Sequence, residues 1–191
     1  MKTCEQHMFG PLLYKTQLST QDLSKVKKLC SKKNEDARNT LAGIIDDEYV
    51  IDEKKYAKII QPYFQPFQEK FHFWYNMQLS KLKCNSAWVN YMKRNESNPP
   101  HHHLNCDLSS VLYLQIPSAL KKENKKYTGK SSGPGSIIFT YGESRDYNIN
   151  QKTFLPNKGD FFIFPYNLKH YVCPFTSNGE RISVSANFKI I

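Results

Sequence analysis

The residues best suited to chemistry are four histidines in the second half of the chain, at His101, His102, His103 and His170. In an extended strand alternate side chains share a face, so His101 and His103 can converge on one point while His102 points away. His170 is the only other histidine in this half, and it is the natural third ligand. Facial three-ligand sites with open positions are typical of non-haem Fe(II) oxygenases. The spacing therefore predicts an iron site, although a histidine run alone also occurs in exposed polar loops.

A second signal is the unbroken alternation of the last ten residues before the C-terminal Ile191. One face would carry Arg181, Ser183, Ser185, Asn187 and Lys189, and the other only apolar side chains. A turn at Asn178-Gly179 is expected to bring Arg181 back alongside His170. A guanidinium with a neighbouring hydroxyl grips a carboxylate well, which predicts a 2-oxo acid cosubstrate. The competing interpretation is a strand whose polar face is simply wetted by solvent.

The elements that must position these residues differ between the two halves of the chain. A short amphipathic helix is predicted from Ser19, its candidate cap, to about Asn34, because apolar residues recur there at helical spacing. Helical spacing of aromatic residues returns from Asp52 to about Leu82. Pro62 and Pro66 interrupt it, so we expect a kink or two helices. We interpret both regions as helices that buttress a sheet.

After Ala87 the pattern has the period of strands. Strands are predicted at 86–93, 108–116, 135–141, 160–165, 169–175 and 181–190. Helices followed by short strands indicate an α+β protein with a sandwich or barrel. We expect one domain over 1–191, with helical support at about 19–84 and a core at about 86–191. The Lys-rich stretch from Lys121 to Gly133 is the predicted mobile loop.

Composition limits the classes of partner and compartment. The 27 Lys and Arg exceed the 17 Asp and Glu, giving a formal charge of +10. Most of the excess lies in Lys-rich runs without interleaved aromatic residues, which favours a solvated surface over a nucleic-acid site. The 5 cysteines are scattered without a CxxC pair, and no signal peptide or long apolar run is visible. These features predict a soluble, cytoplasmic protein without membrane attachment.

Several motifs together resemble one family, the 2-oxoglutarate- and Fe(II)-dependent oxygenases common in bacteria and marine bacteriophages. The resemblance spans about residues 38–190, and Thr40-Leu41-Ala42-Gly43 followed by Glu48-Tyr49 is similar to the phage members. Its strongest parts are Ala87 to Asn90, Pro100 to Asn105, Leu108 to Leu114, Lys158 to Pro165, His170 and Glu180 to Ser183.

The resemblance implies a double-stranded β-helix, a jelly-roll or cupin-like barrel of the prolyl-hydroxylase-like superfamily. It implies His170 as the distal iron ligand, and Arg181 with Ser183 on the far carboxylate of 2-oxoglutarate. The expected activity is hydroxylation of an unidentified small molecule or peptide, using O2 and releasing succinate and CO2. The cofactors are then Fe(II) and 2-oxoglutarate.

One departure concerns the second iron ligand. The wider superfamily supplies His-x-Asp, whereas this chain has His101-x-His103, so we predict a three-histidine triad with Asp107 or Asn105 as alternatives. Tyr113 is a candidate for reaching a cosubstrate carboxylate, and Asn90 with Trp88 for lining the pocket.

Two other functions remain open from the sequence. One is a three-histidine cupin-type dioxygenase that does not use 2-oxoglutarate. The other is a non-catalytic β-barrel module that binds an anion or nucleic acid through its polar strand face and basic charge. Arg181→Ala distinguishes the first from a 2-oxoglutarate enzyme, because only the latter loses 2-oxoglutarate turnover while retaining iron.

Overall fold

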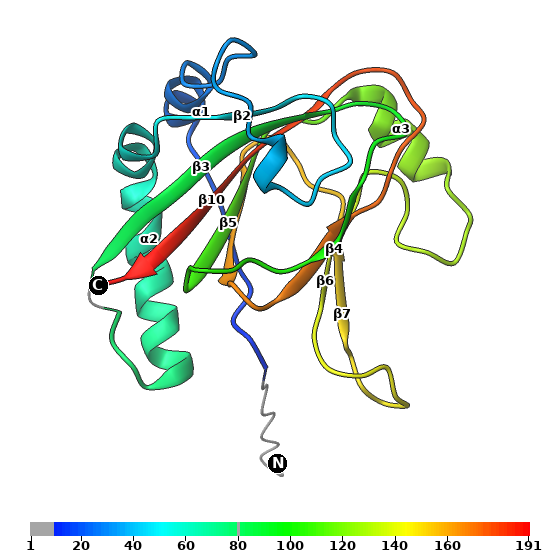
Figure 1. Ribbon diagram of the computed structural model, residues 1–191. Helices are drawn as coiled ribbons and strands as arrows, with labels where there is room; N and C mark the ends of the chain where they lie inside the picture. Colours follow the sequence, from blue (N-terminus) through cyan, green and yellow to red (C-terminus); the bar gives the residue numbers. More distant parts are fainter. Residues whose placement is uncertain (1–9, 80) are drawn as a thin grey trace.

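Two antiparallel sheets face each other in the computed structural model, which describes residues 10–79 and 81–191 (Figure 1). The six-stranded sheet has the order β1 (Tyr14–Gln17), β8 (Asp160–Pro165), β5 (Leu108–Gln115), β10 (Arg181–Ile190), β3 (Leu82–Met92) and β2 (Glu48–Val50). The four-stranded sheet has the order β4 (Asn98–His101), β9 (Lys169–Val172), β6 (Ile137–Thr140) and β7 (Gln151–Phe154). The chain thus combines helices with antiparallel sheets, as the α+β prediction required.

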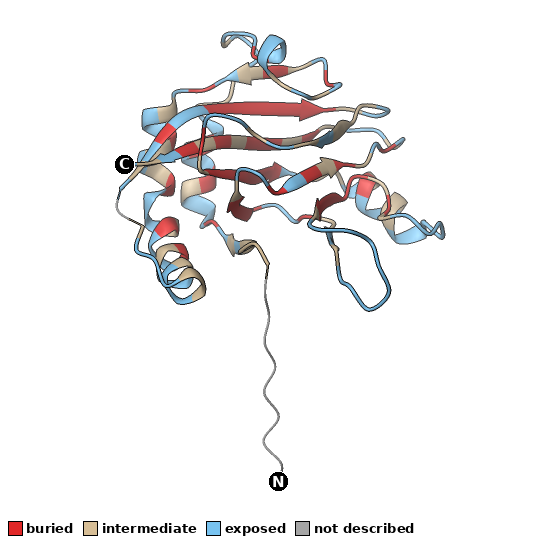
Figure 2. Ribbon diagram, turned by 60° about the horizontal axis from the view of Figure 1, so that its bottom comes forward, coloured by how far each residue is buried: buried red, intermediate tan, exposed pale blue. Residues whose placement is uncertain are grey.

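The six-stranded sheet separates two apolar clusters, which explains the alternation seen in the sequence. The apolar face of β10 packs outward, with Val184, Ala186 and Phe188 in a cluster that also contains residues of α1 (Thr20–Lys27) and α2 (Glu53–Tyr75). The second cluster lies between the sheets. Figure 2 shows buried residues concentrated along the central strands and exposed residues on the outer faces of the helices. Arg181 and Ser183, at the start of the polar face of β10, are therefore buried between the sheets, whereas Lys189 at its end is exposed.

Helix α2 is a single element of 23 residues, so of the two expected outcomes, a kink or two helices, the division into two helices is wrong. Its buried stripe is Tyr56, Ile60, Phe64 and Phe67, which recur at helical intervals against the sheet. Pro62 and Pro66 both lie on the exposed side, where water can satisfy the carbonyl groups that lose their intrahelical donors. Packing of the apolar stripe outweighs the local cost of the prolines.

Several other boundaries differ from the prediction. Ser19 caps α1 as expected, accepting a hydrogen bond from the Asp22 amide, but the helix ends at Lys27 rather than near Asn34. The predicted loop from Lys121 contains most of helix α3 (Ser118–Lys126), which the fully buried Leu120 anchors between the sheets. Four short strands, β1, β2, β4 and β7, were not predicted; the pairing partners of β1, β2 and β4 are distant in sequence, whereas β7 pairs with the preceding strand β6. A 3-10 turn at Arg38–Thr40 precedes β2.

Candidate iron and 2-oxoglutarate site

Three of the histidines converge as the sequence predicts. His101 ends β4, His170 lies on β9, and the two are directly opposite each other in the strand register. His103 follows two residues beyond β4, with its Nε2 atom 3.3 Å from the Nε2 atom of His170. One ligand atom from each of the three histidines lies within 4.8 Å of the others. This is a set of nitrogen donors that could hold one metal ion.

Backbone carbonyl groups orient two of these imidazole rings. Nδ1 of His101 lies 2.8 Å from the Pro99 carbonyl oxygen, and Nδ1 of His170 lies 2.9 Å from the Leu168 carbonyl oxygen. A proton on each Nδ1 makes these contacts hydrogen bonds and leaves Nε2 as the lone-pair nitrogen. Burial lowers the pKa of all three histidines, to about 4 for His103. The rings are thus held neutral, the form that binds metal.

The alternative second ligands lie apart from this cluster. Both carboxylate oxygens of Asp107 are engaged at the end of β10, accepting from Lys189 Nζ at 3.2 Å and from the Ile190 amide at 2.8 Å. Asn105 is exposed and has a left-handed backbone. Asp107 does not belong to the histidine group found among the described residues. The local reason is that the chain leaves β4 at His101, so positions beyond His103 turn back toward the sheet.

The polar face of β10 brings a buried guanidinium and a buried hydroxyl group to the cavity. Arg181 is only 2% exposed, and its Nη2 donates to the hydroxyl of the fully buried Tyr113 at 3.0 Å. Its Nε atom is buried without a hydrogen-bond partner. Ser183 is also buried, and its hydroxyl accepts from Asn90 Nδ2 at 3.4 Å. A buried guanidinium with an unused donor fits a carboxylate ligand.

The relation between Arg181 and His170 differs from the expected one. We predicted that a turn at Asn178-Gly179 would place the two strands side by side. Instead β10 pairs with β3 and β5, while β9 pairs with β4 and β6 in the other sheet. The two residues approach because the sheets face each other across one narrow cavity. It is lined by His101, His103, His170, Arg181, Ser183, Tyr113, Asn90 and Trp88, among others.

A more open groove adjoins the cavity at the histidines. Trp88, His101 and His103 line both. One wall of the groove is the segment Thr40 to Ala42, and another is the run His101 to Asn105. None of the residues that line it is lysine or arginine. The groove that shares His101 and His103 with the cavity thus lacks the basic charge of the chain as a whole.

Some residues around the cavity were not singled out from the sequence. Asn98 lines it with a buried Oδ1 that lacks a partner, but Asn98-Pro99-Pro100 fell between the predicted strands 86–93 and 108–116. Ile45 and Met92 contribute apolar contacts. Glu48, beside Asn90 in the sheet register, is buried as well. In the sequence, Glu48 was noted only because Glu48-Tyr49 is part of the stretch that is similar to the phage members of the family.

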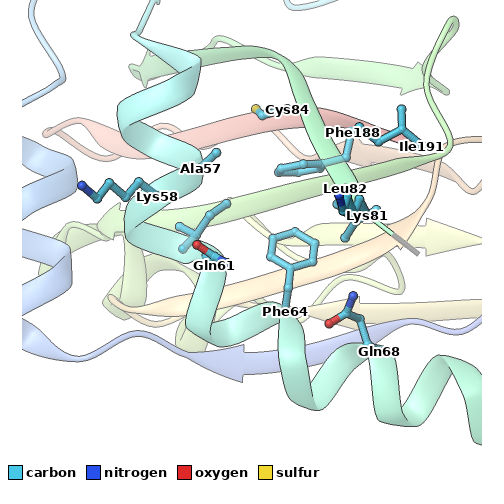
Figure 3. A pocket seen from close by; sticks show the side chains of 11 residues that line it. Ala57, Lys58, Gln61, Phe64, Gln68, Lys81, Leu82, Cys84, Phe188 and Ile191 are labelled. Atoms are coloured by element: carbon cyan, nitrogen blue, oxygen red, sulfur yellow. The ribbon is translucent and has the colours of Figure 1, made fainter. Parts of the chain in front are cut away.

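A separate hollow lies on the far side of the six-stranded sheet, between α2 and the ends of β3 and β10 (Figure 3). Figure 3 shows the ring of Phe64 beside Leu82 and Phe188, with Lys58, Gln61 and Gln68 also on its lining. Its lining has no histidine and no acidic side chain. Although its volume is about 520 Å³, no group of three potential metal ligands was found there among the described residues.

Comparison with known families agrees with the site. Residues 86–187 match the model of the family described as "Putative 2OG-Fe(II) oxygenase", and this span is more than half of the chain. The chain therefore belongs to this family of 2-oxoglutarate- and Fe(II)-dependent oxygenases. As an enzyme of this family it uses Fe(II), 2-oxoglutarate and O2 together with a primary substrate. Neither of the two alternative functions has a finding of its own in support.

Solved structures support the fold. An oxidoreductase of the 2OG-Fe(II) oxygenase family from Burkholderia pseudomallei has a TM-score of 0.59 at 12% identity, covering 94% of this chain and 84% of that one. A Pseudomonas putida prolyl-4-hydroxylase has a TM-score of 0.59 at 14% identity, covering 94% and 92%. The viral collagen prolyl hydroxylase of Paramecium Bursaria Chlorella virus-1 has a TM-score of 0.56 at 13% identity, covering 94% and 96%. No curated protein matches the sequence.

The structure also bears on membrane attachment. Across residues 10–79 and 81–191, no helix combines the length and the apolar character that a bilayer crossing needs. Helix α2 is long enough, but only one side of it is apolar.

Proposed function

We propose that His101, His103 and His170 hold Fe(II), and that Arg181, Ser183, Tyr113 and Asn90 hold 2-oxoglutarate. The observation that carries this assignment is the convergence of three neutral imidazoles across a narrow cavity from a buried arginine. The three-histidine set brings no ligand charge to the metal, so the dianionic cosubstrate itself would balance Fe(II). Asp107, already engaged by Lys189 and Ile190, is not part of the set.

The same proposal includes the finer description of the fold. The two facing antiparallel sheets are consistent with a double-stranded β-helix whose open end holds the metal. We regard 1–191 as a single oxygenase domain, in which the helical part at about 19–84 supports a core at about 86–191. The outward packing of α1 and α2 on the six-stranded sheet supports this division of labour.

The proposed reaction is hydroxylation of a C–H bond. Fe(II) and 2-oxoglutarate, when bound, supply the activation of O2 and the oxidising power, with succinate and CO2 as coproducts. The chain orients the cosubstrate through Arg181 and Ser183, and its apolar lining, including Val111 and Phe164, excludes water. The primary substrate would approach along the groove beside Trp88.

The primary substrate is left open in this proposal. Structures with similar folds include prolyl hydroxylases, HygX from Streptomyces hygroscopicus with hygromycin B, and the epimerase SnoN with nogalamycin RO. Fold alone does not choose among such substrates. Substrate-dependent succinate formation across a panel of peptides and small molecules is the direct way to identify it.

Anaerobic titration tests the cofactor assignment without any primary substrate. Adding Fe(II) and then 2-oxoglutarate to the protein should produce a weak visible charge-transfer band that saturates at one equivalent of each. The band should be lost in His170→Ala and retained in His102→Ala, whose exposed ring is outside the cluster. A folded wild-type protein that gives no band would refute the proposal.

A further inference from the structure

Glu48 on β2 is a buried carboxyl group without a partner. The residue is 1% exposed, and its Oε2 atom makes no hydrogen bond. The backbone of Gly43 lies directly against it, since a Cβ atom added there would be 2.7 Å from Oε1. An uncompensated buried carboxylate is costly, so such a group is expected to be neutral or to have an unrecognised role.

The register of the sheet places Glu48 directly opposite Asn90 of the candidate cosubstrate site. The Tyr91 amide donates to the Asp47 carbonyl at 2.9 Å, which makes the neighbouring positions the hydrogen-bonded pair. Glu48 and Asn90 are therefore a non-hydrogen-bonded pair, whose Cβ atoms are typically about 4.5–5.5 Å apart. Their side chains leave the same face of the sheet, the one that faces the cavity.

Asn90 has a complementary deficiency. Its Nδ2 donates to the hydroxyl groups of Ser183 and Ser185, each at 3.4 Å, but its Oδ1 is buried without a donor. Two residues that are opposite each other in the register thus each have a buried acceptor oxygen without a donor. One proton on the Glu48 carboxyl is enough to satisfy both, because a protonated carboxyl group is a donor.

The charges around Glu48 favour that proton. Burial is the main cause that raises its pKa to about 7, and the carboxylates of Glu96 and Asp36 raise it further. Arg38 acts in the opposite direction and only partly offsets them. Glu96 comes from the loop after β3, and Asp36 and Arg38 from the segment before β2. The carboxyl is therefore largely protonated below neutral pH and ionised above it.

We propose that Glu48 is a positioning residue, whose protonated carboxyl donates a hydrogen bond to Asn90 Oδ1. This bond holds Asn90 Nδ2 toward Ser183 and Ser185, and so orders one side of the cosubstrate pocket. Loss of the proton replaces the bond with repulsion between two acceptors. The inference rests on the proposed function of Asn90 and Ser183, and it adds a device that adjusts 2-oxoglutarate affinity to pH.

The test is 2-oxoglutarate affinity of the Mn(II)-loaded protein, measured by calorimetry at about pH 6 and about pH 8.5, on either side of the Glu48 transition. Because one buried hydrogen bond is lost, the wild type should bind 2-oxoglutarate about 10-fold more weakly at the higher pH than at the lower pH. Glu48→Gln keeps a donor at all pH values, so its affinity should stay close to the low-pH wild-type value. Glu48→Ala should bind weakly at both. Glu69→Gln, on the exposed side of α2, is the matched control and should follow the wild type.

A double-mutant cycle separates this role from a purely structural one. If Glu48 acts through Asn90, then Glu48→Ala should weaken binding in the wild type but not further in Asn90→Ala. Additive losses, or a Glu48→Gln variant with the same pH dependence as the wild type, would overturn the inference. A wild type that binds Mn(II) but no 2-oxoglutarate at either pH would instead refute the proposed function.

Discussion

The two sheets that face each other across the cavity hold their functional groups in different ways. The side chains proposed to bind the cosubstrate come from β3, β5 and β10, long strands of which β3 and β5 both pair with β10 inside the six-stranded sheet. The histidines proposed to bind the metal come from β4 and β9, each four residues long, and from the chain just beyond β4. On the first side the hydrogen-bond ladder fixes the backbone. On the four-stranded side, hydrogen bonds to the Pro99 and Leu168 carbonyl groups orient the rings of His101 and His170.

The largest expected effect is on the metal side. His101→Ala, His103→Ala or His170→Ala should each lower metal affinity by more than about 100-fold, since loss of even an outer-shell partner costs about 10–100-fold. Chelator competition followed by metal analysis measures this. His102→Ala is the control within the same run and should keep full metal occupancy. Equal losses in His102→Ala and His103→Ala would mean that the wrong histidines have been assigned.

A second substitution tests whether the two sides work independently. Arg181→Ala should weaken 2-oxoglutarate binding by about 100-fold, because it removes the buried cation, while leaving metal affinity unchanged. The 2-oxoglutarate affinity of Arg181→Lys should lie between those of the wild type and Arg181→Ala, since lysine keeps the charge but lacks the planar fork of donors. The same calorimetric titration covers both variants. If metal affinity falls together with cosubstrate affinity, the two sheets are coupled more tightly than their separate ladders indicate.

The smallest effect, a small loss of stability, is expected from a substitution at Asp107, which lies between β4 and β5 in the sequence. Asp107→Asn keeps a group that accepts from the Ile190 amide but weakens the ion pair with Lys189. Unfolding in urea should show a loss of about 1 kcal/mol or less. Metal stoichiometry should be unchanged. A variant that folds normally but no longer binds metal would restore Asp107 as the second ligand.

The sequence predicted the six-stranded side of the cavity better than the other. The alternation of β10 is local, so Arg181 and Ser183 could be assigned to one face from spacing alone. Strand β4 could not be predicted in this way, because Asn98-Pro99-Pro100 has the composition of a turn. The segment becomes a strand only through its pairing with β9. For the same reason the sequence misplaced Arg181 beside His170, since nothing local reveals that the chain changes sheets between them.

Burial was the other quantity that the sequence did not reveal. Leu120 is buried in the cluster between the sheets and anchors α3, whose last six residues fall in the predicted Lys-rich loop. The continuity of α2 through Pro62 and Pro66 depends on packing against the sheet rather than on local propensity. Glu48 looked like an ordinary charged residue until the segment around Gly43 was seen to cover it.

The two prolines before His101 have a consequence for the metal-free protein. Proline fixes its own φ angle and restricts the residue before it, so Asn98, Pro99 and Pro100 have few alternative conformations to lose. Ordering a free residue costs about 1–2 kcal/mol in backbone entropy. That cost is therefore lower for these three residues than for freely rotating ones. The histidine run should be found in its binding geometry before any metal is present, and capture of the ion should require little rearrangement of the backbone.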